Sequence, residues 1–294
     1  MREFETRFAK EPSASLAHQA LDGLRDPSLG RVWDRIVNLA RPSARLVRSS
    51  GLSGVTRLGG SPLVGPDFRW PLDPSGEPLA FVGQVDLAEI RKVSELGALP
   101  ATGVLGFFYA ARDQPSGYQS SDRQRWAISY SREPISVVSS PPGTLGFPEV
   151  ALNPTGDLTL PQGDSVDVEN LELNPIEADA YESVLDELRA THGAGRQLSI
   201  HRVGGWPDAI QRDPPIAAQL ASNGVDAGDL AVYQLESTEA VLRRRATWRL
   251  VAQFDSDESI GMMWGVYGRL YFSMREQDLE QRTWETAWAV MQWS

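Results

Sequence analysis

The chain lacks cysteine entirely and has only two lysines, Lys10 and Lys92, among its 294 residues. Without a thiol it can form no disulfide, no cysteine-based zinc site and no thiol nucleophile. The glycine-rich stretches Gly51-Leu52-Ser53-Gly54 and Gly59-Gly60 are not followed by the Gly-Lys-Ser/Thr of a P-loop. Nucleotide hydrolysis of the P-loop type is therefore excluded, and the Rossmann glycine fingerprint is missing as well.

Long apolar runs are also absent from the sequence. The longest run falls far short of the roughly 18 residues that a membrane-spanning helix requires. The basic start, residues 1–10, is not followed by the apolar stretch of a secretory signal. We therefore expect a cytoplasmic protein that has no membrane partner.

The rest of the composition is that of a globular protein, with 41% hydrophobic and 23% charged residues. A chain of this length buries roughly 75% of the surface that it exposes when unfolded. It can therefore fold around its own core without disulfides or a structural metal ion.

Acidic residues are concentrated in one segment of a chain whose net charge is −11. Residues 151–188 contain no lysine or arginine but ten carboxylates: Asp157, Asp164, Asp167, Glu169, Glu172, Glu177, Asp179, Glu182, Asp186 and Glu187. Such a segment repels nucleic acid, which we exclude as a partner. Two interpretations stay open: a solvated loop and helix face, or a docking surface for a basic protein. The basic run Arg243-Arg244-Arg245 is a candidate to pair with it within the chain.

The first 43 residues are predicted to form a helical extension. Apolar residues recur at spacings of three and four in residues 15–25 and 28–41, which is typical of amphipathic helices. Ser28 is a plausible N-cap, and Pro42 forbids continuation of the second helix.

The following region, residues 44–140, is rich in predicted strands, which we place at residues 44–48, 55–58, 79–86, 104–110 and 126–131. A short helix is expected at residues 87–94, with Asp86 as its N-cap. Residues 62–78 contain many prolines and are predicted to be an irregular loop.

Residues 134–175 lack a clear period and are predicted to be a long connector. A helix is expected at 175–192, and it should end at Gly193. Strands are predicted at 198–203, 248–255 and 268–274, and helices at 237–245 and 277–290, although the end of the last one has strand character as well.

Three short motifs occur twice in the same order, which indicates an internal duplication. Gly59-Gly60-Ser61-Pro62 matches Gly204-Gly205-Trp206-Pro207, residues 81–86 match 250–255, and residues 103–108 match 268–273. We therefore expect an α+β fold of two sequence-similar halves with mainly antiparallel sheets packed together, plus the helical extension. The domain would span residues 44–294, with half one at about 44–140, a connector and helix at 141–196, and half two at about 197–294.

These motifs resemble those of the YwqG-like family, a bacterial family of unknown function. Residues 59–62, Trp70-Pro71 and residues 78–87 resemble its first half, and residues 201–211, 248–257 and 261–279 resemble its second. The resemblance implies an α+β fold with two similar structural motifs and implies no activity. The family usually has Trp-Gly-Asp before the last glycine-led strand, whereas here Val266 follows Trp264-Gly265. Any role of that family aspartate, such as metal binding, is in doubt in this chain.

The duplicated Gln-x-Asp motif is the main candidate for a binding site. Residues two apart on a strand share a face, so Gln84 and Asp86 point one way, as do Gln253, Asp255 and, if the strand continues, Asp257. If the halves pack about a twofold axis, both sets converge on one cleft, which would suit a cation or a polyhydroxy ligand. The alternative is that these side chains satisfy backbone groups at strand ends.

Three further features have both a functional and a structural interpretation. The acidic stretch at residues 255–259 resembles a Ca²⁺ or Mg²⁺ loop but lacks the complete EF-hand pattern, so an exposed turn is the alternative. His201 is the only histidine within a motif, and a lone histidine is more often structural than catalytic. Trp264 is one of several loop tryptophans, which can line a ligand groove or anchor a loop in the core.

The sequence favours a non-enzymatic cytoplasmic binding module, with a basic protein as partner through residues 151–188. The alternative is a metal-assisted hydrolase or ligand-binding enzyme with a site between the halves. The candidate ligand-binding residues are Gln84, Asp86, His201, Gln253, Asp255, Asp257 and Trp264. We expect no cofactor and no resident metal ion, and the sequence does not decide whether the protein is an enzyme.

Overall fold

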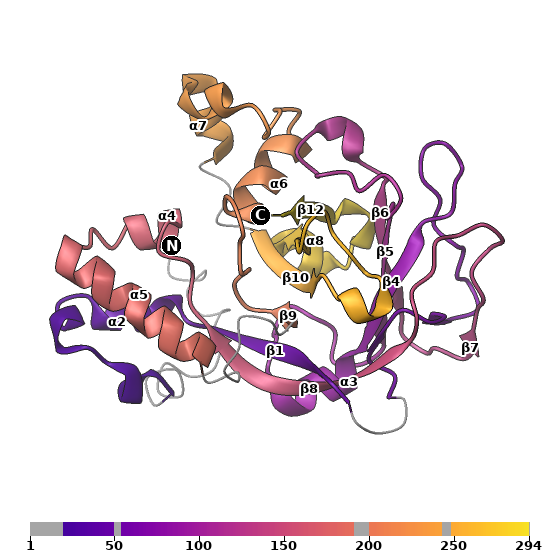
Figure 1. Cartoon of the computed structure of the whole chain (residues 1–294), viewed down its shortest axis with the longest axis horizontal. Coiled ribbons are helices and arrows are strands. Elements are labelled where there is room, and N and C mark those ends of the chain that lie inside the picture. Colours follow the sequence, from indigo (N-terminus) through magenta and orange to yellow (C-terminus); the bar gives the residue numbers. More distant parts are fainter. Residues whose placement is uncertain (1–19, 50–53, 191–199, 243–247, 294) are drawn as a thin grey trace.

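A computed structural model describes residues 20–49, 54–190, 200–242 and 248–293 (Figure 1). The strands are β1 (Arg41–Arg48), β2 (Arg57–Leu58), β3 (Leu63–Val64), β4 (Ala80–Asp86), β5 (Val104–Tyr109), β6 (Trp126–Ser131), β7 (Ser136–Val137), β8 (Val150–Thr159), β9 (His201–Gly204), β10 (Trp248–Asp255), β11 (Arg269–Arg275) and β12 (Trp288–Gln292). The α-helices are α2 (Trp33–Leu39), α3 (Leu87–Val93), α4 (Val166–Glu169), α5 (Pro175–Ala190), α6 (Pro214–Ser222), α7 (Glu236–Leu242) and α8 (Glu276–Gln281). Short 3-10 helices are η1 (Asp22–Leu24), η2 (Pro27–Leu29), η3 (Ser120–Asp122), η4 (Leu230–Gln234), η6 (Glu258–Ile260) and η7 (Trp284–Thr286).

One large antiparallel sheet dominates the fold, in the strand order β12-β11-β10-β9-β1-β8-β2-β4-β5-β6. β3 and β7 form a separate two-stranded ribbon. The expected α+β fold with antiparallel pairing is confirmed. The expectation of sheets packed together differs from the structure, because the strands of both regions join into a single sheet.

The sheet curls until its two edge strands meet. The indole N–H of Trp126 on β6 donates to the carbonyl of Ala287 just before β12 (2.9 Å), and the rings of Trp126 and Trp288 lie 5.1 Å apart. The backbone N–H of Met291 on β12 donates to the carbonyl of Ser116, in the β5–β6 connection. The two edges of the sheet therefore contact each other, and the curl is nearly closed.

The main core fills the inside of this curl. Alternate residues of the strands point inward, and aromatic side chains from distant strands meet there. Phe107 on β5 lies 5.0 Å from Phe254 on β10 and 5.1 Å from Phe272 on β11, measured between ring centroids. All three side chains are fully buried.

A second, smaller core lies outside the sheet. Among the described residues, its buried members all come from residues 21–40 and 160–188, with Trp33, Ile36, Tyr181 and Val184 among the most buried, and Leu158 of β8 packs against it. β1 and β8 run as a long ribbon from the sheet toward the helices α2, α4 and α5 that enclose this core (Figure 1). We call residues 21–40 and 160–188 the helical module.

Several predicted elements are confirmed at or close to their predicted positions. β6 and β10 have the predicted bounds, β4 and β5 differ from them by one residue at one end, and β11 differs by one residue at each end. α3 begins after its N-cap Asp86, whose carboxylate accepts the backbone N–H of Ala88 (2.8 Å). α5 forms the predicted helix through residue 190, and its predicted end at Gly193 lies outside the described residues.

Other predictions were wrong. Residues 134–175 are not a plain connector, because they contain β8, a central strand that pairs with β1 and β2. The predicted helix at 28–41 is divided into η2 and α2 and ends at Leu39, and Pro42 lies within β1. The last predicted helix stops at Gln281, and its end is the strand β12, which confirms the strand alternative for that end. Residues 15–19 of the predicted helix at 15–25, and all of Arg243-Arg244-Arg245, lie outside the described residues, and residues 22–24 form the 3-10 helix η1.

The described helices are too short or too polar for a bilayer crossing.

Candidate functional site

Gln84 on β4 holds the loop that leads from β2 into β3. Its side chain is almost completely buried, and its Oε1 accepts the backbone N–H of Leu63 (2.8 Å). Its Nε2 donates to the carbonyl of Val55 (2.7 Å). The amide therefore satisfies two backbone groups that lack a strand partner, and both its donor and its acceptor are engaged.

Gln253 on β10 makes the corresponding contacts after β9. Its Oε1 accepts the backbone N–H of Asp208 (2.9 Å), and its Nε2 donates to the carbonyl of Ile200 (3.0 Å). Leu63 and Asp208 each come directly after the proline of a Gly-Gly-x-Pro turn. The two glutamines thus hold the same loop position in the two parts of the chain.

Further contacts around these loops correspond as well. Arg57 donates to the carbonyl of Ser61, and Arg202 donates to that of Trp206 (3.2 Å). The end of each loop is held by the last residue of an edge strand. Ser131 on β6 accepts the backbone N–H of Gly65 (3.0 Å), and Gln292 on β12 accepts that of Ile210 (3.0 Å).

The strands below the loops share an irregularity. The pairing of β4 with β5 shifts between Phe81 and Gly83, and that of β10 with β11 shifts between Leu250 and Ala252. These are equivalent positions of the repeated motif. A bulge adds one residue to a strand and changes which side chains face the core, so its position fixes where each Gln-x-Asp points.

The two Gln-x-Asp motifs do not converge. Four strands, β9, β1, β8 and β2, separate β10 from β4 in the sheet. The neighbours Val85 and Phe254 belong to the main core, so alternation turns both glutamines to the opposite, outer face. Each glutamine lies under its own loop.

The aspartates of the two motifs differ in their contacts. Asp86 caps α3, whereas Asp255 accepts the backbone N–H of Ile200 (2.9 Å) and the Nε–H of Arg269 (2.9 Å). Burial is the largest influence on the pKa of Asp255 and raises it, with Arg269 opposing this effect in part.

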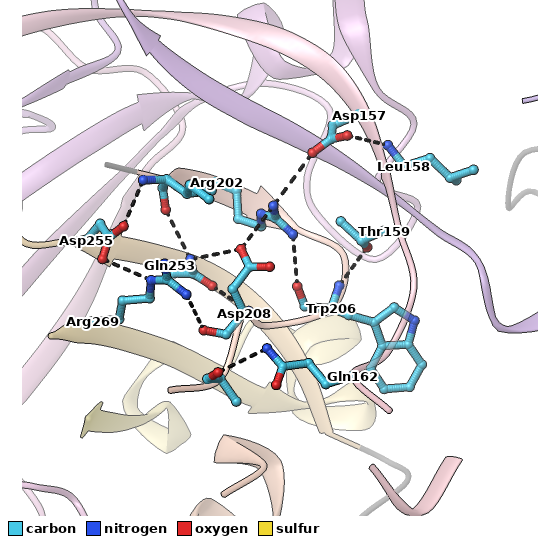
Figure 2. Close-up of polar contacts among 12 residues, drawn as sticks. Asp157, Leu158, Thr159, Gln162, Arg202, Trp206, Asp208, Gln253, Asp255 and Arg269 are labelled. Atoms are coloured by element: carbon cyan, nitrogen blue, oxygen red, sulfur yellow. Dashed lines mark hydrogen bonds and ion pairs between the residues drawn. The ribbon is translucent and has the colours of Figure 1, made fainter. Parts of the chain in front are cut away.

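Asp255 belongs to a polar cluster around the second Gly-Gly turn (Figure 2), of which the first part has only the ion pair of Arg57 with Glu149 (3.5 Å) among its described residues. Arg202, with its side chain 3% exposed, lies between Asp208 (3.0 Å) and Asp157 (3.7 Å). The carbonyl of Asp208 accepts Nη1–H of Arg269 (2.7 Å) and the hydroxyl of Tyr271 (2.7 Å). The equivalents of Asp208, Arg269 and Tyr271 in the first part are Leu63, Val104 and Gly106.

The charges of this cluster compensate one another. Burial alone would raise the pKa of Asp208, but Arg202 and Arg269 outweigh it and lower that pKa. Burial likewise acts to lower the pKa of Arg269, and Asp255 and Asp208 reverse the effect. The cluster therefore favours the charged forms of Asp208 and Arg269, and it joins β8, β9, β10 and β11 to the loop after β9.

The motifs contained a signal for part of this cluster that the sequence analysis missed. An arginine precedes both Gly-Gly turns by two residues, Arg57 before Gly59 and Arg202 before Gly204. Asp157, Arg269 and Tyr271 are brought there by strand pairing alone and have no such local signal.

His201 lies inward at the start of β9, next to the end of β10. Its Nδ1 accepts the backbone N–H of Asp255 (3.1 Å), so this nitrogen carries no proton. Burial lowers the pKa of His201 to about 4, which keeps the ring neutral. As placed, His201 is a hydrogen-bond acceptor for the backbone.

Asp257 caps η6 by accepting the backbone N–H of Ser259 (3.2 Å), and it pairs with Arg48. Burial would raise the pKa of Asp257, but the hydrogen bonds from Arg48 and Ser259 lower it. Among the described residues, no three His, Asp or Glu side chains lie close enough to bind one metal ion.

Trp264 is fully buried in the main core. Its ring makes edge contacts with Tyr109 (5.5 Å) and Phe147 (5.9 Å) between centroids. It anchors the exposed turn residues Val266 and Tyr267, which are 59% and 62% exposed.

Exposed carboxylates are concentrated on the helical module rather than on the sheet. The exposed ones between residues 160 and 190 are Asp164, Glu169, Glu172, Asp179, Glu182, Asp186 and Glu187. Glu177 is instead buried and accepts both Nε–H and Nη2–H of Arg31 (2.9 and 2.7 Å). Arg189 is the only cation of this stretch, and it pairs with Asp186 (3.1 Å).

Comparison with known proteins gives a family but no activity. No curated protein matches the chain. The model of a domain of unknown function, DUF1963, matches residues 56–293. It includes both Gln-x-Asp motifs and the polar cluster, and leaves out residues 21–40 of the helical module. Because the match covers most of the chain, the protein belongs to the DUF1963 family.

Proposed function

We propose that this protein is a non-enzymatic binding module that recruits a basic protein partner through the acidic face of its helical module. The observation that carries the proposal is the group of exposed carboxylates on residues 164–187, a stretch that contains no lysine or arginine. The nearby cations are engaged elsewhere: Arg31 pairs with the buried Glu177, Arg35 donates to the carbonyls of Asn170 and Leu171, and Arg189 pairs with Asp186. Such a surface attracts a basic partner and accelerates its encounter. The cytoplasm is the compartment that we propose for this activity.

We also propose that the sheet arose by duplication of one strand-and-loop unit, as in the YwqG-like family that the sequence resembles. Support comes from the corresponding contacts of Gln84 and Gln253 and from the equivalent bulges in β4 and β10. Equivalent residues of the two units, Phe107 and Phe272, meet in the core, as is expected near a twofold axis.

We place the proposed partner surface away from the Gln-x-Asp motifs, because the side chains of these motifs already bind groups within the protein. The amides of Gln84 and Gln253 are engaged with backbone groups, and Asp255 and Asp257 are paired with Arg269 and Arg48. A ligand would have to break these buried contacts before it could bind. No observation favours the metal-assisted hydrolase over this structural role.

The test is affinity capture from cell lysate with the full-length protein as bait. The variant Asp179→Lys/Glu182→Lys reverses two exposed charges of α5. We expect the wild type to retain a basic protein at about 0.05 M salt and to release it at about 0.5 M, where exposed charges are screened. The variant should bind that protein at least about tenfold more weakly.

The control variant Asp67→Lys/Glu280→Lys reverses two exposed carboxylates that lie elsewhere. It has the same net charge as the test variant, so a difference between the two reports the position of the charge. The control should bind like the wild type. Recovery of no basic protein, or equal weakening in both variants, would contradict the proposal.

A further inference from the structure

The helical module has its own core. Among the described residues, every buried side chain of the smaller core comes from residues 21–40 or 160–188, with only Leu158 of β8 packing against it from the sheet, and the side chains of the sheet's main core come from other parts of the chain. Two segments that are far apart in sequence therefore fold together there. A region whose apolar contacts are mostly internal can open as a unit, at a free-energy cost smaller than that of global unfolding.

Among the described residues, two strands and one loop connect this module to the sheet. β1 and β8 are paired up to Arg41 and Thr159, where the chain enters the module. The loop at residues 205–209, which follows β9, lies against this point (Figure 2). The positive φ of Gly205 (74°) and its missing side chain allow the approach, because a Cβ there would lie 2.6 Å from Oγ1 of Thr159.

Trp206 makes most of the contacts of this loop with the module and its base. Its indole N–H donates to the carbonyl of Leu39 at the end of α2 (2.7 Å), and its backbone N–H donates to Oγ1 of Thr159 (2.8 Å). The guanidinium of Arg41 lies 3.3 Å from the centroid of the indole ring. A second contact comes from Gln162, whose Nε2 donates to the carbonyl of Ala209 (3.0 Å).

The first Gly-Gly-x-Pro turn has no such contact, because Ser61 stands where Trp206 stands in the second. The glutamine, arginine and edge-strand contacts that hold the loop occur at both Gly-Gly-x-Pro turns, but only the second turn carries a tryptophan that contacts the helical module. The loop therefore does not need Trp206 to keep its own conformation, and the contacts of Trp206 serve the helical module.

We propose that the helical module opens and closes as a unit on the sheet, and that Trp206 is the latch that holds it closed. The latch determines how far the module separates from the sheet and, with it, how its outer face is presented. This inference concerns the free protein and holds whether or not a basic partner binds.

Hydrogen–deuterium exchange of the native full-length protein tests the latch with two matched substitutions. Trp206→Phe removes the hydrogen bond to Leu39 but keeps an aromatic ring under Arg41. Trp264→Phe removes an indole N–H that has no partner in the fully buried environment of the main core. Both substitutions remove a similar side-chain volume. A difference in exchange between them therefore reports whether the helical module or the main core is affected.

We expect Trp206→Phe to accelerate exchange in α2 and α5 about fivefold, the effect of one lost hydrogen bond, and to leave β10 and β11 unchanged. Trp264→Phe should accelerate exchange in β10 and β11 and leave α2 and α5 unchanged. Equal acceleration throughout the protein in both variants, or no change in α2 and α5 on Trp206→Phe, overturns the proposal. If Trp206→Phe does not fold, Gln162→Ala removes the second contact and must give the same local pattern.

Discussion

At the scale of single residues, the side chains that attract attention in the sequence are those that complete the backbone hydrogen bonding of the fold. Gln84 and Gln253 each satisfy one backbone N–H and one carbonyl beneath a loop. Leucine at either position would leave both backbone groups buried and unpaired. We expect Gln84→Leu and Gln253→Leu each to lower the free energy of unfolding by about 2–4 kcal/mol.

Urea denaturation measures this effect, with Gln281→Leu on the exposed end of α8 as the control. The control should change stability by less than about 0.5 kcal/mol. A loss of similar size for all three variants, or a negligible loss for the two buried glutamines, would refute the loop-holding role.

His201 gives the protein a defined dependence on pH. Its folded pKa of about 4 lies below the ordinary value of about 6.5, so between these values the unfolded chain binds a proton that the folded chain does not. The stabilisation is complete above pH 6.5 and is lost as the pH falls to 4, by about 3 kcal/mol in total. Denaturation at a series of pH values should show this loss.

His201→Asn keeps an acceptor near the backbone N–H of Asp255 and removes the titrating ring. The variant should be less stable at neutral pH, and its stability should fall less steeply between pH 6.5 and 4 than that of the wild type. An unchanged slope would mean that other groups cause the acid sensitivity.

The carboxylates at residues 255–257 should not respond to metal ions, because Arg269 and Arg48 already neutralise them. Thermal melting with millimolar Ca²⁺, Mg²⁺, Mn²⁺ or Zn²⁺ should give the same midpoint as melting with a chelator. A ligand at about a hundred times its dissociation constant stabilises by about 2.7 kcal/mol, which would be visible. A rise that disappears in Asp255→Asn or Asp257→Asn would restore the metal-site hypothesis.

At the scale of elements, the sequence predicted strands well where a run of apolar residues is buried on both faces of the sheet, and failed where backbone pairing alone forms the strand. β4, β5 and β10 carry strong apolar patterns and were placed to within one residue at either end. β8 includes Pro154 and Gly156 together with polar residues, so it has no strand signature. It is held by backbone pairing with β1 along most of its length and with β2 at its start.

The Gly-Gly turns are elements whose conformation the sequence did signal. Gly59 has a φ of 54°, and a Cβ there would lie 2.3 Å from the carbonyl oxygen of Pro148. Gly76 also has a positive φ (89°), but nothing lies within 4 Å of its would-be Cβ. A comparison of substitutions at Gly59 and Gly76 therefore separates the cost of backbone strain from the cost of steric overlap.

We expect Gly76→Ala to lower the free energy of unfolding by about 1 kcal/mol, the cost of the left-handed backbone alone. Gly59→Ala must in addition displace β8 or the turn and should cost at least about 2 kcal/mol more. Chemical denaturation of the two variants makes the comparison. Equal losses would show that the turn does not need its close approach to residues 147–148.

At the scale of the whole molecule, the sequence predicted which motifs repeat but not how they assemble. Repeated motifs reveal local contacts, such as those of Gln84 and Gln253, because each unit makes them within itself. They do not reveal that β1 and β8 join the units into one sheet, or that β6 and β12 meet through Trp126 and Trp288. The expected cleft between two Gln-x-Asp motifs does not form, because the motifs point out of the curl and not into it.

The proposed partner surface lies on the helical module, which stands apart from the sheet and carries the exposed carboxylates. The most direct test is hydrogen–deuterium exchange of the complex with the captured basic protein, compared with the free chain. The account predicts slower exchange in residues 164–190 on binding and no change in residues 200–212 or 253–264. Slower exchange over the loop after β9 and the end of β10, with residues 164–190 unaffected, would contradict it.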